Sequence, residues 1–328
     1  MKIRSLLLAV VVGAALVSAP AHAATQLSVG VAYDIGGRGD KSFNDASAAG
    51  LEKAQKQFDF NLEAVVTDGT STDREKRIRS LITKKCNPIV AIGAGYAATL
   101  QALAVEFPNT QFAIINDASV AALNVTSVVF ADTQGAYLAG FSAAQVSKSG
   151  KVAMIANPDQ ADLYKDGFSA GVFASKKKVI PIVKYVSGSY SLATSQVLDA
   201  GADVVFAATQ GSNSEIFKVI VARNAKKKGS NIGLINIEPD QYITVTSATK
   251  RFLFASVVKR VDKAIYDVIA LSAAKRAYLD ILDGDAGIYG RRYGITGGGI
   301  EFTIRSKELA VLSDSINVAA ATAEKILA

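Results

Sequence analysis

Residues 89–117, IVAIGAGYAATLQALAVEFPNTQFAIIND, contain the pattern that decides the fold. Two short, continuous apolar runs, at 89–92 and 112–115, flank a segment at 97–107 whose apolar residues recur with helical spacing. Strands that are apolar on both faces, and separated by a helix, are typical of a parallel sheet covered by helices on both sides. The stretch therefore predicts a β-α-β unit of an α/β protein.

The same unit recurs on both sides of this stretch. Before it, strands are predicted at 27–33 and 62–66, with helices at 43–58 and 73–84. After residue 150 the alternation begins again, with strands at 151–155, 179–186, 204–207 and 232–237 and helices at 161–174, 192–200 and 215–225. Two similar passes in one chain predict an α/β fold of two doubly wound parallel-sheet lobes joined by a hinge.

The pattern changes after residue 240. We predict a short strand at 254–257, a long helix at 261–282, a Gly-rich hairpin from 284 ending at 302, and a last helix at 307–327. The expected lobe one is 24–131, with 257–285 returning to it. The expected lobe two is 132–256, with 286–328 joining it. Hinge crossings are expected near 128–134, 238–256 and 284–290.

The first 23 residues have the pattern of an export signal. Lys2 and Arg4 precede an apolar run at 6–17, and Ala21-His22-Ala23 forms an A-x-A cleavage site. We expect a mature chain that starts at residue 24 in the periplasm. No cysteine follows the apolar run, so no lipid anchor is expected, and we expect a monomer.

Composition excludes several kinds of chemistry. His22 is the only histidine and lies in the export signal, and Cys86 is the only cysteine. A Ser-His-Asp or Cys-His nucleophile, a His- or Cys-rich metal site and an internal disulfide are therefore excluded. We expect no catalytic residue, no metal and no cofactor. The formal net charge is +7, but its lysine clusters fall at predicted helix ends, so no nucleic-acid partner is expected.

The loop at 34–45, DIGGRGDKSFND, has the richest chemistry of the strand-end loops. In open α/β sheets, ligands bind at the carboxyl ends of the strands. Ser42 or Asn44 is predicted to cap the next helix, and Phe43 stands at a helix start, either facing a cleft or packing in the core. The loop matches neither the phosphate-binding P-loop nor the dinucleotide fingerprint.

Other strand ends carry further candidate residues. Asp117 follows a lobe-one strand, Glu238 and Asp240 follow the last strand of lobe two, and Phe217 lies one turn into a lobe-two helix. Ionised carboxylates only accept hydrogen bonds, so they suit ligands rich in hydroxyl or N–H groups. For each carboxylate a helix-capping role is an equal alternative.

Taken together, these segments resemble the basic membrane protein family, the PnrA-like purine-nucleoside-binding lipoproteins. The key match is 34–44, DIGGRGDKSFN, against the family's D-x-G-G-x-x-D-x-S-F-N. Supporting matches are YLAG at 137–140, DGF at 166–168, Asp240-Gln241 and SVVK at 256–259. The resemblance covers most of the mature chain. It implies a type I periplasmic binding protein fold, a small-molecule ligand and the permease of an ABC importer as partner.

The resemblance also implies roles for single residues. Phe43 and Phe217 would hold a purine between their rings, and Ser42 belongs to the same motif as Phe43. Asp34, Asn44 and Asp117 would bind the base edge or the sugar. Asp240 and Lys259 would bind ribose hydroxyls, and Lys259 could pair with Asp240. Glu238 departs from the family's aspartate by one methylene.

Two departures, Glu238 and the bulkier loop QGSN at 210–213, lie on the sugar side of the implied site. A purine base therefore competes with a nucleoside as the implied ligand. One alternative function is a sugar- or signal-binding protein of the same fold. A less favoured alternative is an exported nucleoside hydrolase or glycosidase, since glycosidases need only two carboxylates.

Overall fold

We analysed a computed structural model of the chain. It describes residues 26–158, 161–186, 188–209, 213–226, 229–237, 241–243 and 245–326. The predicted export signal at 1–23 lies outside this part. No helix within the described ranges is both long and apolar enough to cross a bilayer.

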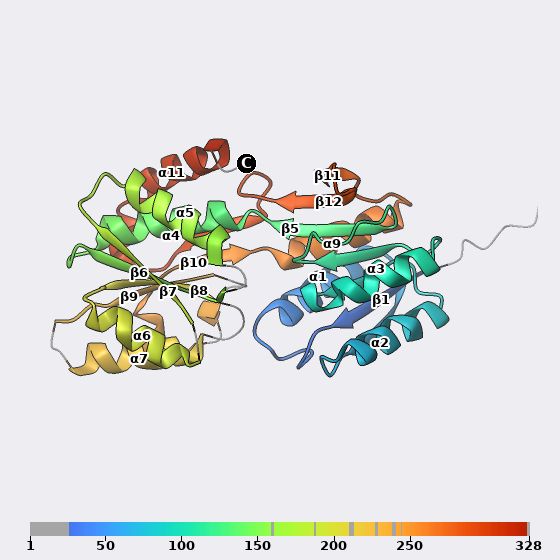
Figure 1. Ribbon diagram of the computed structural model, residues 1–328, viewed down its shortest axis with the longest axis horizontal. Coiled ribbons are helices and arrows are strands. Elements are labelled where there is room, and N and C mark those ends of the chain that lie inside the picture. The colour runs from blue at the N-terminus through green and yellow to red at the C-terminus, as the bar shows by residue number, and fades with distance from the viewer. Residues whose placement is uncertain are drawn as a thin grey trace, which may run out of the picture.

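The described strands form two sheets, one in each of two lobes (Figure 1). The seven-stranded sheet of lobe one has the order β11-β12-β5-β4-β3-β1-β2. Its strands are β1 (Leu27–Tyr33), β2 (Phe60–Val66), β3 (Ile89–Ile92), β4 (Phe112–Ile115), β5 (Val125–Phe130), β11 (Asp280–Asp283) and β12 (Ile288–Tyr293). Its helical elements are α1 (Phe43–Gln55), α2 (Ser71–Thr83), the 3-10 turn η1 (Ala94–Tyr96), α3 (Ala97–Glu106) and α9 (Val261–Ala273).

Lobe two is built in the same way around a six-stranded sheet of order β13-β10-β9-β8-β6-β7 in the described chain. Its strands are β6 (Lys151–Ala156), β7 (Ile180–Tyr185), β8 (Val204–Ala208), β9 (Gly233–Ile237), β10 (Leu253–Lys259) and β13 (Ile300–Ile304). Its helical elements are α4 (Asp132–Val146), α5 (Ala161–Ala174), α6 (Tyr190–Asp199), α7 (Ser214–Lys226), η3 (Gln241–Ile243), α8 (Ser247–Lys250), α10 (Lys307–Ala310) and α11 (Ser313–Ile326).

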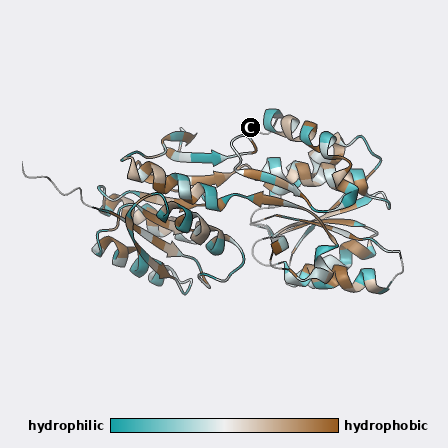
Figure 2. Ribbon diagram, turned by 180° about the vertical axis from the view of Figure 1, so that it is seen from behind, coloured by the Kyte–Doolittle hydropathy of each residue, from teal (hydrophilic) through white to brown (hydrophobic). Residues whose placement is uncertain are grey.

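The predicted fold class is confirmed: both sheets are mostly parallel and covered by helices. Edge strands β11 and β13 run antiparallel to their neighbours. The central strands β3 and β4 are buried along their whole length, as their continuous apolar runs require. Figure 2 shows the hydrophobic residues concentrated on the strands and on the helix faces that cover them.

Helix α1 packs closely against α9. A Cβ at Gly50 would lie 2.4 Å from the backbone oxygen of Asp262, so only glycine lets the two helices approach this far. This contact attaches the start of α9 to lobe one and sets where the chain returns from lobe two.

Three segments of the described chain cross between the lobes (Figure 1). The first joins β5 to α4 at 130–132, the second joins β10 to α9 at 259–261, and the third joins β12 to β13 at 293–300. Their backbones are hydrogen-bonded to one another. The N–H of Ala131 donates to the oxygen of Tyr293 at 2.9 Å, and the N–H of Arg260 donates to the oxygen of Gly299 at 2.9 Å.

The structure corrects the predicted lobe boundaries in two places. Residues 286–328 were expected to join lobe two, but β12 pairs in parallel with β5 of lobe one. A Cβ at Gly290 would lie 1.7 Å from the oxygen of Ser127, so glycine allows this close pairing. The return to lobe one begins after Lys259 rather than at residue 257, because β10 belongs to the sheet of lobe two. The second and third crossings accordingly differ from the predicted 238–256 and 284–290.

The long helix predicted at 261–282 ends early, at Ala273. Lys275 adopts a positive φ of 54°, and the N–H of Arg276 donates to the oxygen of Leu271 at 2.8 Å. This is the hydrogen bond of a Schellman C-cap, with lysine in place of the usual glycine. The residues that follow form β11 instead of a further helical turn.

Candidate functional site

Lys259 is the most deeply buried charge at the junction of the lobes. Its side chain is 0% exposed, and Nζ lies 2.8 Å from Oδ1 and 3.0 Å from Oδ2 of Asp132. Nζ also donates to the Tyr164 hydroxyl at 2.9 Å. Burying an ammonium ion is costly unless it is paired and hydrogen-bonded, and here both conditions are met.

Aromatic rings enclose the same ammonium. Nζ of Lys259 lies 5.6 Å from the ring centroid of Tyr164, 5.7 Å from that of Phe43 and 6.0 Å from that of Phe130. These distances are those of cation–π contacts. Phe43 and Phe130 belong to lobe one and Tyr164 to lobe two, so the cluster joins both lobes at the carboxyl ends of β5 and β10.

The loop at 34–45 delivers Phe43 to this cluster, and Asp40 shapes the loop. Oxygens of Asp40 accept from the backbone N–H groups of Ser42 at 2.9 Å, Asn44 at 3.0 Å and Asp45 at 3.1 Å. Asp40 thus supplies the cap of α1 that the sequence had assigned to Ser42 or Asn44. Ser42 occupies the N-cap position without a side-chain capping bond.

Asn44 is 2% exposed and holds the loop from inside. Its Oδ1 accepts from the N–H of Asp34 at 3.1 Å. Its side-chain nitrogen lies 3.5 Å from each of the oxygens of Asp34 and Ile35. The structure therefore gives Asn44 a role in fixing the loop.

Asp34 forms an ion pair with Arg74 of α2, with 2.9 Å between Oδ1 and Nη2. The Arg74 guanidinium lies over the ring of Tyr96, 5.5 Å from its centroid. The Tyr96 hydroxyl donates to the oxygen of Tyr33 at 2.8 Å, and burial raises the pKa of Tyr96. These residues form the wall of lobe one at the carboxyl ends of β1 and β3.

The remaining predicted site residues are more dispersed. Asp117 accepts from the N–H of Ser119 at 2.8 Å and from its hydroxyl at 2.7 Å, which closes a local turn after β4. Phe217 is 4% exposed and packs in the apolar cluster between the sheet of lobe two and α6 and α7. Glu238 and Asp240 lie outside the described residues, so the predicted pairing of Asp240 with Lys259 does too.

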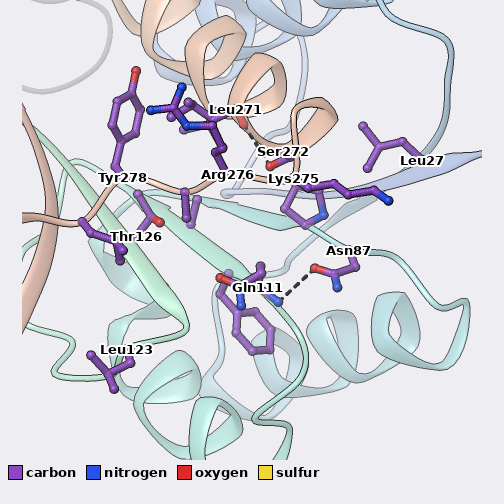
Figure 3. A pocket seen from close by; sticks show the side chains of 16 residues that line it. Leu27, Asn87, Gln111, Leu123, Thr126, Leu271, Ser272, Lys275, Arg276 and Tyr278 are labelled. Carbon is purple, nitrogen blue, oxygen red and sulfur yellow. Dashed lines mark hydrogen bonds between the residues drawn. The ribbon is translucent and has the colours of Figure 1, made fainter.

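Two hollows in the described part of the molecule differ in their position relative to this site. One, of about 550 Å³, lies between the amino ends of β1 and β4 and the end of α9, with Leu27, Phe112 and Arg276 in its wall (Figure 3). It occupies the edge of the sheet opposite to the one where α/β proteins bind ligands. A second, of about 460 Å³, lies between α7 and α8, with the predicted ligand residue Phe217 in its wall and Lys41 of the 34–45 loop at its rim. Within the described ranges, no three His, Cys, Asp or Glu side chains are grouped as metal ligands.

Comparison with known proteins identifies this architecture. The family described as "ABC transporter substrate-binding protein PnrA-like" matches residues 27–327. The chain belongs to this family. The family consists of substrate-binding components of ABC transporters rather than enzymes, and its members act outside the cytoplasm.

Relatives and solved structures agree with this membership. A "CD4+ T-cell-stimulating antigen" of Listeria innocua is 28% identical over 269 residues, which cover 75% of this chain and 74% of the relative. An "ABC transporter nucleoside-binding protein BmpA" of Lactococcus lactis is 25% identical over 261 residues, 74% of each chain. A solute-binding protein from Aeropyrum pernix K1 has a TM-score of 0.68 at 21% identity, with 91% and 86% of the two chains covered. At that identity the structural match shows the fold alone.

Sequence reasoning missed three residues of this region: Asp132, Tyr164 and Arg74. An acidic residue in the first turn of a helix is usually explained by the helix dipole, so Asp132 gave no signal of its own. A usable signal was the lysine at the end of the apolar run 253–259, because a buried lysine needs a carboxylate partner.

Proposed function

We propose that this chain binds a purine nucleoside or purine base between its lobes and delivers it to the permease of an ABC importer. The observation that carries the proposal is the position of Phe43. Its ring stands at the carboxyl edge of lobe one, beside the ammonium of Lys259 from β10, where the lobes meet. An aromatic face beside a fixed cation suits a flat, polar ring system.

Several neighbouring groups support a purine ligand. Asp34 presents a carboxylate that is 37% exposed from the same loop. In the proposed site, Phe43 stacks on the base, Asp34 and Asp117 accept hydrogen bonds from lobe one, and Lys259 and Asp240 contact the sugar. Ser42 and Asn44 shape the loop, while Phe217 and Glu238 complete the side of lobe two. The printed name of the Lactococcus relative, a nucleoside-binding protein, favours the same ligand class.

The proposal extends to the location of the protein. An export signal at 1–23 would be removed in the periplasm, leaving a monomer without a lipid anchor. Closing of the lobes around the ligand would form the surface that the permease recognises.

Mass spectrometry of the material released by the denatured, freshly purified protein tests the ligand. It is paired with calorimetry against adenosine, guanosine, inosine, adenine and hypoxanthine. A purine bound with a Kd of about a micromolar or below supports the proposal. Binding of a free base alone would mean that the departures from the family pattern, Glu238 and the loop at 210–213, change the specificity from nucleoside to base. Absence of purine binding would refute the proposal and favour a sugar or signal ligand.

A further inference from the structure

In the wall of lobe one, the two carboxylate oxygens of Asp34 differ in their hydrogen bonding. Oδ1 of Asp34 is bound by Nη2 of Arg74 at 2.9 Å. In the part of the chain that the structure describes, Oδ2 accepts no hydrogen bond, and the Asp34 side chain is 37% exposed. A ligand approaching this wall therefore meets one oxygen that already accepts a charged hydrogen bond and one that accepts none within the described residues.

Arg74 is held rigidly in this arrangement. Its side chain is 13% exposed, and Nη1 donates to the backbone oxygen of Gly69. The guanidinium lies directly on Gly95, where a Cβ would be 2.6 Å from Cζ. The ring of Tyr96 also contacts the guanidinium, through the cation–π contact described above. A change at Gly95 or Tyr96 would therefore move the cation and, with it, the bound oxygen of Asp34.

A purely structural role in stabilising the fold does not explain well why Arg74 occupies this position. Nε of Arg74 is buried, and among the described residues it has no hydrogen-bond partner. A buried donor without a partner reduces stability, so the guanidinium does not occupy the position that best satisfies its own hydrogen bonds. What the position does achieve is the fixed contact with Oδ1 of Asp34.

We infer that Arg74 is a specificity-determining residue that acts through Asp34. The inference rests on the proposed purine ligand. An ionised carboxylate with two available oxygens matches two adjacent N–H donors, such as N1–H and the 2-amino group of guanine. Because Oδ1 already accepts from the Arg74 cation, it is the weaker acceptor for a second N–H, and Oδ2 is the better acceptor for a ligand donor. The wall then favours a purine edge with one N–H, as in hypoxanthine, over the paired donors of guanine.

Inosine and guanosine test the inference, because they differ by the 2-amino group alone. Calorimetry gives the ratio of their Kd values for the wild-type protein, Arg74→Gln and Arg74→Lys. Arg77→Gln is the matched control, since Arg77 lies on the same helix and pairs with Asp73 instead. Circular dichroism and the urea midpoint verify that each variant is folded.

We expect Arg74→Gln to shift the ratio towards guanosine by about tenfold, the effect of one charged hydrogen bond. Arg74→Lys should shift it less, because lysine keeps the charge and loses the planar fork. Arg77→Gln should leave the ratio unchanged. If Arg74→Gln destabilises the fold, Arg74→Lys carries the test alone. An unchanged ratio in a folded Arg74 variant that still binds both nucleosides would overturn the inference and leave the proposed function standing. Failure of the wild-type protein to bind either nucleoside would overturn the inference, and failure to bind any purine, free bases included, would overturn the proposed function as well.

Discussion

The ammonium of Lys259 and the carboxylate of Asp132 lie 2.8 Å apart and link two of the crossings between the lobes. Lys259 is the last residue of β10, and Asp132 is the first residue of α4. Each therefore stands where the chain passes from one lobe to the other. The pair joins the first crossing to the second, while the backbone bonds described above join each of these to the third.

Loss of the carboxylate should destabilise the protein strongly. Asp132→Asn removes the carboxylate that pairs with the buried Lys259 ammonium, and breaking a buried pair from one side costs about 3–5 kcal/mol. Urea unfolding measures the loss. The double variant Asp132→Asn/Lys259→Met should recover part of it, because the ammonium is then removed together with its Asp132 partner. Glu106→Gln, which breaks the exposed pair with Arg79, serves as control and should change the midpoint little. A double variant less stable than Asp132→Asn alone would contradict this account.

Phe43 should contribute to ligand binding more than to folding. Phe43→Leu keeps most of the side-chain volume but removes the stacking face, which is worth about 1–3 kcal/mol per base. We therefore expect the calorimetric Kd for the preferred purine to rise about tenfold or more, with a urea midpoint near that of the wild type. Phe58→Leu is the control, because Phe58 is another partly buried ring packed on the same core cluster. Equal affinities of wild type and Phe43→Leu would exclude stacking on this ring.

Phe217 should contribute to folding more than Phe43 does. Its ring packs in the cluster of lobe two with little exposed surface, so Phe217→Ala should cost about 3–5 kcal/mol of unfolding free energy. Phe173→Ala provides the contrast, since Phe173 is 87% exposed on α5. A Phe217→Ala variant with wild-type stability and weakened purine binding would assign the ring to the ligand, as the family resemblance implies.

Asp262 gives stability a defined dependence on pH. Burial of the carboxyl is the largest single effect and would raise its pKa, but the hydrogen bonds and charge of Arg260, the backbone N–H of Lys263 and the charge of Lys53 together hold the pKa below its usual value. A depressed folded-state pKa stabilises the protein above the unfolded-state value of about 3.9, and this contribution is lost as the pH falls through the folded-state pKa. Asp262→Asn should therefore be less stable than wild type at pH 7, with a difference that shrinks as the pH falls below about 4. Urea unfolding across this range measures both proteins, and a constant difference would refute the assignment.

Much of the fold was predictable because its strands are apolar along their whole length. The strands at 27–33, 89–92 and 112–115 were predicted with their observed bounds. The strand β5 and the helix α4 were missed. Residues 125–130 have the adjacent polar pair Thr126-Ser127 next to apolar residues, and α4 is buried on nearly every side, so neither shows the expected period. The early end of α9 was missed because a lysine occupies the left-handed cap position.

The part of the site that carries a sequence motif was predictable. The interactions between residues far apart in the sequence were not. The loop at 34–45 has a recognisable pattern, and the structure places Phe43 beside Lys259. The capping role of Asp40 depends on the path of a glycine-rich loop, which the spacing of residues does not specify. Arg74 lies 40 positions from Asp34, and Asp132 lies 127 positions from Lys259. Pairs at such separations follow from the packing of whole elements, which a single sequence does not reveal.

The pairing of β12 with β5 has a consequence for how the chain is completed. Residues 132–287, which include almost all of lobe two up to β10, lie between these neighbouring strands. A chain that leaves a membrane channel from its amino end must therefore expose the edge of β5 until nearly the whole sequence has emerged. Pairing across so long an interval is slow, and an open strand edge invites aggregation. The edge of β5 thus stays open to wrong partners until residues 288–293 are in place.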